Sequence, residues 1–355
     1  LAEAYDPVRH DPSFMMELER TLFALAVRRP TPLMHLRRLS AHLGGAQLHL
    51  KREDLAGEYP HLTAAIAGQA LLARRLGRST VALGTADGRR GLVAATVAAR
   101  LGLQAVVYMD PEQAERAGAA VSLMKLLGAD VQLVRAANCR NSDLREAALA
   151  HWARLPDEVL LLTGLDAAPA PYPDITAEMT AVIGRECRRQ AAQRMPELIV
   201  ARGERTSDAL GVFPAFLADT GVRLVCVDPV PEPEVEARNA PDPFNQIGMP
   251  LNAVEKHIAG RILDRIEYPN VGREHALLKA SGRVEYLRVP RSAARQALID
   301  LARVEGVLMP IETAHALAFA CAAARQLPSE QSIIVVMAEP PSQNLWDIER
   351  AVGGR

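Results

Sequence analysis

The 355-residue sequence has little of several features that mark common classes of protein. Aromatic residues make up 4% of it, so few rings are present on which nucleic-acid bases could stack. The formal net charge of -1 gives no electrostatic attraction for nucleic acid or an anionic membrane. No apolar run approaches the ~20 residues of a membrane-spanning helix, and no charged-then-apolar leader precedes the first domain. We therefore expect a protein that binds neither nucleic acid nor membrane.

Cysteine is also scarce, and its placement excludes the usual metal motifs. The four cysteines, Cys139, Cys187, Cys226 and Cys321, lie far apart in the sequence and lack the paired spacing of zinc sites. Isolated, buried and reduced thiols are the ordinary state of cysteine in the cytoplasm. We therefore predict a cytoplasmic protein without a metal site.

What the sequence does contain is typical of a globular α/β protein. Its 49% hydrophobic and 23% charged residues suit a soluble chain, and its length suits two domains of roughly 100–200 residues each. Apolar runs with strand patterns alternate with helical patterns, which predicts parallel sheets with helices on both faces. The expected strands are 47–51, 80–83, 105–109, 129–134, 159–162, 197–201, 223–227 and 332–337. Among the expected helices are 113–127 and 176–193, while the proline-rich segment 228–252 is expected to cross the surface.

The stretch from Lys51 to Gly77, KREDLAGEYPHLTAAIAGQALLARRLG, resembles a known family when it is taken with four others. The others are RPTPL (29–33), MKLLGADV (124–131), YPNVGREHALLKASGRVEY (268–286) and EGVLMPIETAHALA (305–318). Together they make the chain similar to the β subunit of tryptophan synthase, a fold-type II pyridoxal-phosphate (PLP) enzyme. The resemblance implies two three-layer αβα domains, 1–185 and 186–355, with a mobile subdomain at about 77–164 and the cofactor between the domains. It also implies a homodimer and an α-subunit-like partner.

The residues that hold the cofactor in this family are replaced here. The family has a Schiff-base lysine after the histidine that corresponds to His61, and this chain has Leu62, whose isobutyl group cannot form an imine. The family's phosphate-binding glycines precede Ser-Asn at a helix N-terminus, where bare backbone N–H groups face the phosphate. Here Glu204-Arg205-Thr206 precede Ser207-Asp208, and the carboxylate of Glu204 would repel a phosphate dianion.

Two further positions lose the family's chemistry. The glutamate that moves protons corresponds to Gly84, and the serine that bonds the pyridine nitrogen corresponds to Glu339, followed by two prolines. Four losses that affect the imine, the phosphate, the ring nitrogen and proton transfer predict that the chain does not bind PLP. Lys51 is the one nearby lysine that could substitute for the lost one.

Charged residues that the chain keeps or gains supply the candidate site residues. Carboxylates that share a cleft can have raised pKa values and act as general acids. The candidate catalytic residues are Glu204, Glu339, Asp87, Glu305 and His61. The candidate substrate-binding residues are Arg89, Arg90, Arg205, Leu62, Gln69 and Arg116. For Glu305 and for His315 a structural role is favoured over catalysis, and Glu204–Arg205 and Asp87–Arg89/Arg90 salt bridges that fill a dead pocket are the alternative to a working site.

Three functions follow from this pattern. The first is a PLP-independent enzyme of lyase, isomerase or cyclase type, which acts by acid–base or electrostatic catalysis on an aromatic or apolar small molecule, such as an indole derivative, in natural-product biosynthesis. Its substrate would lie in the interdomain cleft. The second is a catalytically inactive pseudoenzyme that serves as a scaffold or regulatory subunit. The third is a PLP-dependent tryptophan synthase-like lyase. An open cavity with convergent acids favours an enzyme, and paired charges in a collapsed pocket favour a scaffold.

Overall fold

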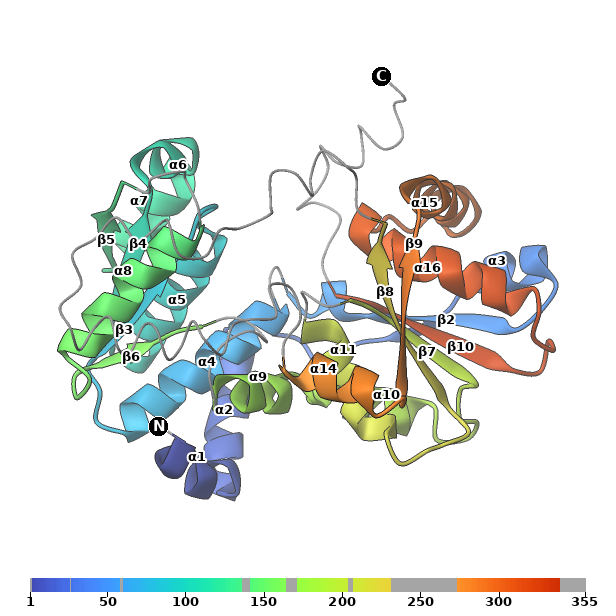
Figure 1. The fold of residues 1–355 in the computed structure, drawn as a ribbon, viewed down its shortest axis with the longest axis horizontal. Coiled ribbons are helices and arrows are strands. Elements are labelled where there is room, and N and C mark those ends of the chain that lie inside the picture. Colours follow the sequence, from blue (N-terminus) through green and yellow to red (C-terminus); the bar gives the residue numbers. More distant parts are fainter. Residues whose placement is uncertain are drawn as a thin grey trace. The chain divides into compact units, whose positions relative to one another are not determined.

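The computed structural model describes residues 2–25, 27–57, 60–135, 141–163, 171–203, 207–230 and 273–338. They belong to two compact units, whose elements are labelled in Figure 1. Unit 1 contains the described residues of 1–25 and 62–176, and unit 2 contains those of 26–61, 177–238 and 270–355. Each unit is built around its own, mainly parallel sheet. The predicted α/β fold class is therefore confirmed.

Unit 2 contains a six-stranded sheet in the order β1-β2-β10-β7-β8-β9. The first strand is antiparallel to its neighbour, and the other pairs are parallel. Its strands are β1 (Leu33–His35), β2 (Gln47–Arg52), β7 (Leu198–Arg202), β8 (Arg223–Pro229), β9 (Val284–Val289) and β10 (Ser332–Met337). Both faces of the sheet are apolar, since Ile333 and Val335 of β10 enter one core and Ile334 and Val336 enter another. A sheet that is buried on both faces needs a layer of helices on each side.

The helices of unit 2 supply these two layers (Figure 1). On one face the core contains residues of α3 (Arg37–Leu43), α15 (Arg291–Glu305) and α16 (Ile311–Ala324). On the other it contains residues of α10 (Val182–Gln190), α11 (Ser207–Val212), the 3-10 helix η2 (Phe213–Phe216) and α14 (Arg273–Ala280). A short 3-10 helix, η1 (Glu53–Leu55), follows β2. The arrangement is the predicted three-layer αβα architecture.

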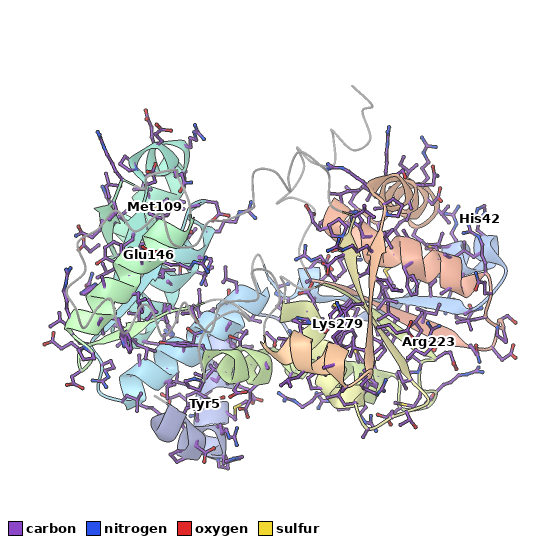
Figure 2. All side chains as sticks on the ribbon, viewed as in Figure 1. Tyr5, His42, Met109, Glu146, Arg223 and Lys279 are labelled. Carbon is purple, nitrogen blue, oxygen red and sulfur yellow. The ribbon has the colours of Figure 1, made fainter. Side chains whose placement is uncertain are left out.

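Unit 1 contains a four-stranded parallel sheet in the order β5-β4-β3-β6. Its strands are β3 (Thr80–Gly84), β4 (Gln104–Met109), β5 (Asp130–Leu133) and β6 (Val159–Leu161). Its helices are α1 (Ala2–Arg9), α2 (Pro12–Ala24), α4 (Pro60–Arg75), α5 (Arg89–Leu101), α6 (Pro111–Arg116), α7 (Gly118–Leu126) and α8 (Asn141–Arg154), followed by α9 (Tyr172–Thr180). Figure 2 marks Met109 at the end of β4 and Glu146 on α8.

Two details differ from the sequence expectation. Residues 26–61 belong to unit 2, because β2 pairs with β10, so the units exchange chain segments instead of meeting at residue 185. The single helices expected over 113–127 and 176–193 are each divided, at Ala117 and at Ala181. The helix expected from residue 113 begins at Pro111. It begins there because the side chain of Asp110 accepts a hydrogen bond from the backbone N–H of Glu112 and Pro111 suits the first position of a helix. In the part of the chain that the structure describes, we find no helix with the length and apolar character needed to cross a membrane.

The β1–β2 ladder places two histidines directly opposite one another. His35 and His49 are register partners, and their rings stack at 4.6 Å between centroids with 16° between planes. His35 Nε2 donates a hydrogen bond to Gln47 Oε1 at 3.0 Å. His49 Nδ1 is buried and has no hydrogen-bond partner among the described residues. Burial, aided by the neighbouring His35, lowers the pKa of His49 below its usual 6.5.

This pair predicts an acid-sensitive contribution to stability. Because the pKa of His49 is lower in the folded state than in the unfolded state, the stabilising neutral form is fully present above pH 6.5, and stability falls as the pH drops below that value. We expect His49→Gln to flatten the fall in Tm between about pH 7 and 5, measured by thermal unfolding. His42→Gln, at an exposed position of α3, is the control. Equal slopes for wild type and His49→Gln would contradict this assignment.

Candidate functional site

Lys51, the candidate replacement for the lost cofactor lysine, lies in β2 and its side chain is entirely buried. Its Nζ donates hydrogen bonds to Glu186 Oε2 at 2.7 Å, to the Thr31 carbonyl oxygen at 2.8 Å and to Gln190 Oε1 at 3.0 Å. Glu53 Oε1 lies 3.7 Å away. An ammonium group has three N–H donors. All three donors therefore have acceptors, and the nitrogen has no lone pair free for attack on a carbonyl.

Arg29 joins the same group of charges. Its Nη1 is 2.9 Å from Glu53 Oε2 and its Nε is 3.0 Å from Glu186 Oε1. The backbone N–H of Thr31 also donates to Glu186 at 3.0 Å, and its hydroxyl donates to Glu53. We call Arg29, Lys51, Glu53 and Glu186 the buried ion cluster. Its two cations match its two carboxylates, which is the condition under which buried charges are tolerated. Lys51 is thus a structural cation in this fold.

The loop after β3 carries the predicted residues of unit 1. Gly84, at the position of the family's proton-moving glutamate, is packed against the backbone of α8. A Cβ atom built on Gly84 would lie 2.4 Å from the carbonyl carbon of Leu144 and 2.8 Å from the backbone nitrogen of Arg145. Real Cβ atoms do not approach backbone this closely. The packing of α8 on the end of β3 therefore leaves no room for any side chain at residue 84.

Asp87 and its two neighbouring arginines have different environments. Asp87 forms an ion pair with Arg89, at 3.1 Å between Oδ2 and Nε, and accepts a hydrogen bond from the Arg89 backbone N–H at 3.1 Å. Arg90 has a buried Nε without a hydrogen-bond partner among the described residues. Burial, with added repulsion from Arg145, lowers the pKa of Arg90 to about 10, and the charge of Asp87 offsets this only in part. Arg90 is therefore a partly buried cation that needs an anion.

Carboxylates occupy the end of β7 and the start of α11, where the family's phosphate site would be. Asp208, in the first turn of α11, is 2% exposed and its Oδ2 lies 3.6 Å from Arg202 Nε. The carboxylate of Asp228 packs on the backbone of Gly203, so closely that a Cβ there would overlap it. A helix N-terminus attracts negative charge, and here Asp208 supplies that charge from within the chain. The described residues at this place do not match a phosphate cradle made of bare N–H groups.

Several other predicted site residues have structural contacts. Gln69 is buried and binds the Thr163 backbone through both ends of its amide, at 2.6 and 3.0 Å. Glu305 Oε1 accepts a hydrogen bond from the Leu39 backbone N–H at 2.8 Å, near the start of α3. His315 Nδ1 lies 2.9 Å from the Ile311 carbonyl oxygen within its own helix. Glu305 and His315 thus both make polar contacts within the chain.

The remaining predicted site residues are exposed, half-buried or outside the described part of the chain. Arg116 is an exposed side chain whose ion pair with Glu112 spans 3.8 Å within one helix. Leu62 is half-buried in the first turn of α4. Glu204, Arg205 and Glu339, and the side chain of His61, lie outside the described residues. Arg145, whose charge repels that of Arg90, is not among the residues expected from the sequence. A single exposed arginine on a helix has no recognisable pattern, and its place near the loop after β3 follows only from the packing of α8 on Gly84.

Within the described residues, no group of three or more histidine, cysteine, aspartate or glutamate side chains is arranged to hold a metal ion. The three described cysteines, Cys187, Cys226 and Cys321, are buried. Burial raises the pKa of Cys187 to about 12 and that of Cys321 to about 12. These thiols therefore stay protonated at neutral pH and serve as small apolar groups.

The chain has two units, each with a mainly parallel sheet, and the chain passes between the units more than once. This is the fold of the type II PLP enzymes, and comparisons with known proteins lead to the same class. The family model described as "Pyridoxal-phosphate dependent enzyme" matches residues 25–339. The tryptophan synthase beta chain of Stenotrophomonas maltophilia (strain K279a) is 38% identical over 349 residues, covering 94% of this chain and 85% of the relative. That of Xylella fastidiosa (strain 9a5c) is 37% identical over 347 residues, with the same coverage.

Among solved structures, the processed form of threonine deaminase isoform 2 from Solanum lycopersicum matches with a TM-score of 0.66 and 17% identity, covering 97% of this chain and 94% of that one. Diaminopropionate ammonia lyase from Escherichia coli matches with a TM-score of 0.64 and 18% identity, covering 98% and 94%. At this identity the two structures support the fold alone. The chain belongs to the pyridoxal-phosphate dependent enzyme family, in the branch of the tryptophan synthase β chains.

The buried ion cluster predicts a large effect of removing one of its charges. Lys51→Met should leave Glu186 buried without its closest cation and lower the free energy of unfolding of unit 2 by about 3–5 kcal/mol. Lys125→Met, at an exposed position of α7, is the matched control and should change it by less than about 0.5 kcal/mol. Urea unfolding followed by circular dichroism measures both, and similar midpoints for the two variants would contradict the structural role of Lys51.

Proposed function

We propose that this chain is a PLP-independent member of the tryptophan synthase β branch, which binds an anionic small molecule with an aromatic or apolar body. The observation that carries the proposal is the state of its lysines. The chain has only four, Lys51, Lys125, Lys256 and Lys279. Lys51 is held in the buried ion cluster. Lys125 and Lys279 are exposed on α7 and α14, and Lys256 lies outside the described residues.

The surroundings of α11 support the same proposal. A PLP phosphate would approach the carboxylates of Asp208 and Asp228 in unit 2, and like charges at short range oppose binding. Gly84 adds to the case, because the packing of α8 leaves no space for a proton-moving side chain there. The residues present therefore do not fit the cofactor, and we derive no chemistry through it.

The experiment that tests PLP independence is an absorbance scan of the purified protein mixed with PLP, before and after dialysis. We expect a flat visible spectrum after dialysis, because no described lysine combines an accessible amine with a site for the phosphate. A retained visible band that Lys51→Ala abolishes would show that the ion cluster opens for the cofactor. It would support instead the PLP-dependent lyase function that the names of the relatives suggest.

Arg90 is the residue around which we propose ligand binding. It lies in the first turn of α5, at the carboxyl end of the parallel sheet of unit 1, which is the edge where α/β sheets bind ligands. Among the described residues its cation has no ion pair, since Asp87 is held by Arg89. An anion on the ligand would relieve the repulsion between Arg90 and Arg145. Acid–base catalysis extends this proposal to a lyase, isomerase or cyclase type of enzyme in natural-product biosynthesis, and Glu204 and Glu339 are the general acids that the sequence suggests.

This assignment predicts selectivity for carboxylates. Aromatic carboxylic acids, indole carboxylates among them, should bind more tightly than the matched neutral amides, and Arg90→Gln should weaken the acids by about tenfold or more while leaving the amides unchanged. Isothermal titration calorimetry measures both series, with Arg38→Gln on the exposed face of α3 as a charge-matched control. Equal affinity for acids and amides would remove Arg90 from the site.

The second candidate is a scaffold or regulatory subunit without catalysis. It is favoured by the contacts of Asp87, Gln69 and Glu305, whose polar groups bind within the chain and are not presented to a ligand. For both candidate functions we also propose a homodimer, an α-subunit-like partner and a cytoplasmic location. Failure of every ligand in the carboxylate series to bind wild-type protein would favour the scaffold.

A further inference from the structure

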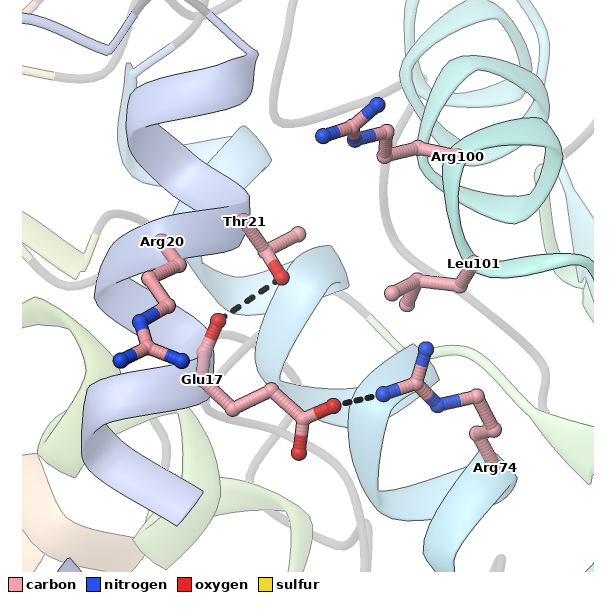
Figure 3. Close-up of a pocket in the computed structure, with 6 residues that line it drawn as sticks. All are labelled: Glu17, Arg20, Thr21, Arg74, Arg100 and Leu101. Carbon is pink, nitrogen blue, oxygen red and sulfur yellow. Dashed lines mark hydrogen bonds and ion pairs between the residues drawn. The ribbon is translucent and has the colours of Figure 1, made fainter. Parts of the chain in front are cut away.

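The small pocket of unit 1 contains a charge that is already paired. It lies between α2 and the last turns of α4 and α5, and its volume is about 200 Å³ (Figure 3). Glu17 forms an ion pair there with Arg74, and Thr21 donates its hydroxyl hydrogen to the Glu17 carbonyl oxygen at 2.8 Å. Arg20 and Arg100 point to different sides, so they do not converge on one ligand. The surface of unit 1 that lacks a partner lies elsewhere, at β5.

The strand β5 is at the edge of the unit 1 sheet (Figure 1). β4 pairs with one side of it, and among the described residues no strand pairs with the other side. The N–H and C=O groups of successive strand residues point to opposite sides. Because the Val134 N–H donates to the Met109 carbonyl oxygen of β4 at 2.9 Å, the backbone groups of Val131 and Leu133 point to the open side. Unpaired groups of this kind are a template for a further strand.

The side chains at this edge face α7. A Cβ atom built on Gly91 of α5 would meet both Val107 of β4 and Met124 of α7, so Val107 points to the face of the sheet that α7 covers. Val131 is the register partner of Val107 and therefore points to the same face. Leu133, two residues further along β5, does so too.

This face is apolar and exposed at the edge. Leu133 is 58% exposed, and Leu123 and Leu126 of α7, which contacts β5, are 46% and 81% exposed. Edge strands are commonly protected by lysine, proline or a bulge, and β5 contains neither lysine nor proline. Its one charge, on Asp130, accepts a hydrogen bond from Gln132 Nε2 at 2.6 Å on the opposite face. Since β5 has only four residues, the leucines of α7 must supply much of any contact made here.

We propose that the β5 edge binds the same edge of a second copy of this chain, as an antiparallel pair about a two-fold axis at Gln132. The inference rests on the homodimer proposed for both candidate functions and names its surface. In this register Val131 lies opposite Leu133 of the partner subunit, and the two residues exchange N–H···O bonds. The two-fold axis repeats the exchange, so every backbone group of Val131 and Leu133 on the open side is used.

The order of side chains favours a second copy in this register. Apolar Val131 and Leu133 meet across the axis, which stabilises a strand pair. Gln132 meets its own copy, and an amide both donates and accepts hydrogen bonds. The next permitted register would place Val131 opposite the charged Arg135 of the partner subunit. In the proposed pair, the α7 helices of both copies lie on one face of a continuous sheet, where their exposed leucines flank the contact.

Sedimentation equilibrium of the full chain tests the surface. We expect twice the chain mass of 38.4 kDa for wild type, and a dimer dissociation constant about tenfold or more higher for Leu133→Lys, because its ammonium group would be buried without a carboxylate. Leu277→Lys on α14 of unit 2 is the matched control, since Leu277 is 59% exposed, and it should dimerise as wild type does. Thermal unfolding checks that Leu133→Lys is folded, because replacing an exposed leucine changes Tm little.

A cysteine substitution tests the register. Gln132→Cys should give a dimer linked by the two introduced cysteines, with oxidised glutathione as the oxidant, because residues opposite one another in such a pair have Cα atoms about 4.5 Å apart. Peptide mass spectrometry identifies the bond, and Leu277→Cys should form none. Absence of the bond in Gln132→Cys would overturn the register.

The outcomes separate this surface from the proposed function. A wild-type dimer that Leu133→Lys leaves intact would overturn the β5 surface and retain the homodimer. A monomeric wild-type chain would overturn both the surface and the homodimer, and would leave the open edge to a strand of a different protein. Neither result alters the carboxylate titration that tests Arg90.

Discussion

The buried ion cluster of Arg29, Lys51, Glu53 and Glu186 is the constraint on which much of unit 2 depends. It joins three segments that are distant in sequence: the chain before β1, the end of β2, and α10. Lys51, Glu53 and Glu186 are buried, so none of them can lose its partner without a large cost. Together with the pairing of β2 and β10, these ion pairs hold residues 26–61 in unit 2, although the chain passes through unit 1 immediately before and after them.

The cluster also connects fold to function. Lys51 stabilises the fold with all of its N–H groups, so the chain that lacks a lysine at residue 62 has no free substitute at the end of β2. In unit 1, the same kind of replacement is seen at Gly84, where backbone packing takes the space of a side chain. Arg90 differs, because its buried Nε has no hydrogen-bond partner among the described residues.

The sequence was sufficient for eight of the ten described strands, because apolar runs such as 332–337 and 198–201 alternate with helical patterns. It did not predict β1 or β9 as strands. Salt bridges of Asp87 with Arg89 and Arg90 were the alternative to a working site, and the structure has the Asp87–Arg89 pair. The sequence could not indicate that β2 crosses to unit 2, because strand partners distant in sequence leave no local pattern. The approach of α8 to Gly84 depends on tertiary packing, which the sequence of a single segment does not reveal.

The central claim is that no lysine of this chain carries PLP. Its most direct test is reductive trapping: incubation of the folded protein with excess PLP, borohydride reduction, and peptide mass spectrometry of all four lysines. We predict only partial, nonspecific labelling of the exposed Lys125 and Lys279, and none at Lys51. Stoichiometric labelling of a single lysine, whether Lys51 or Lys256, would show that the cofactor has a dedicated site and would contradict the account.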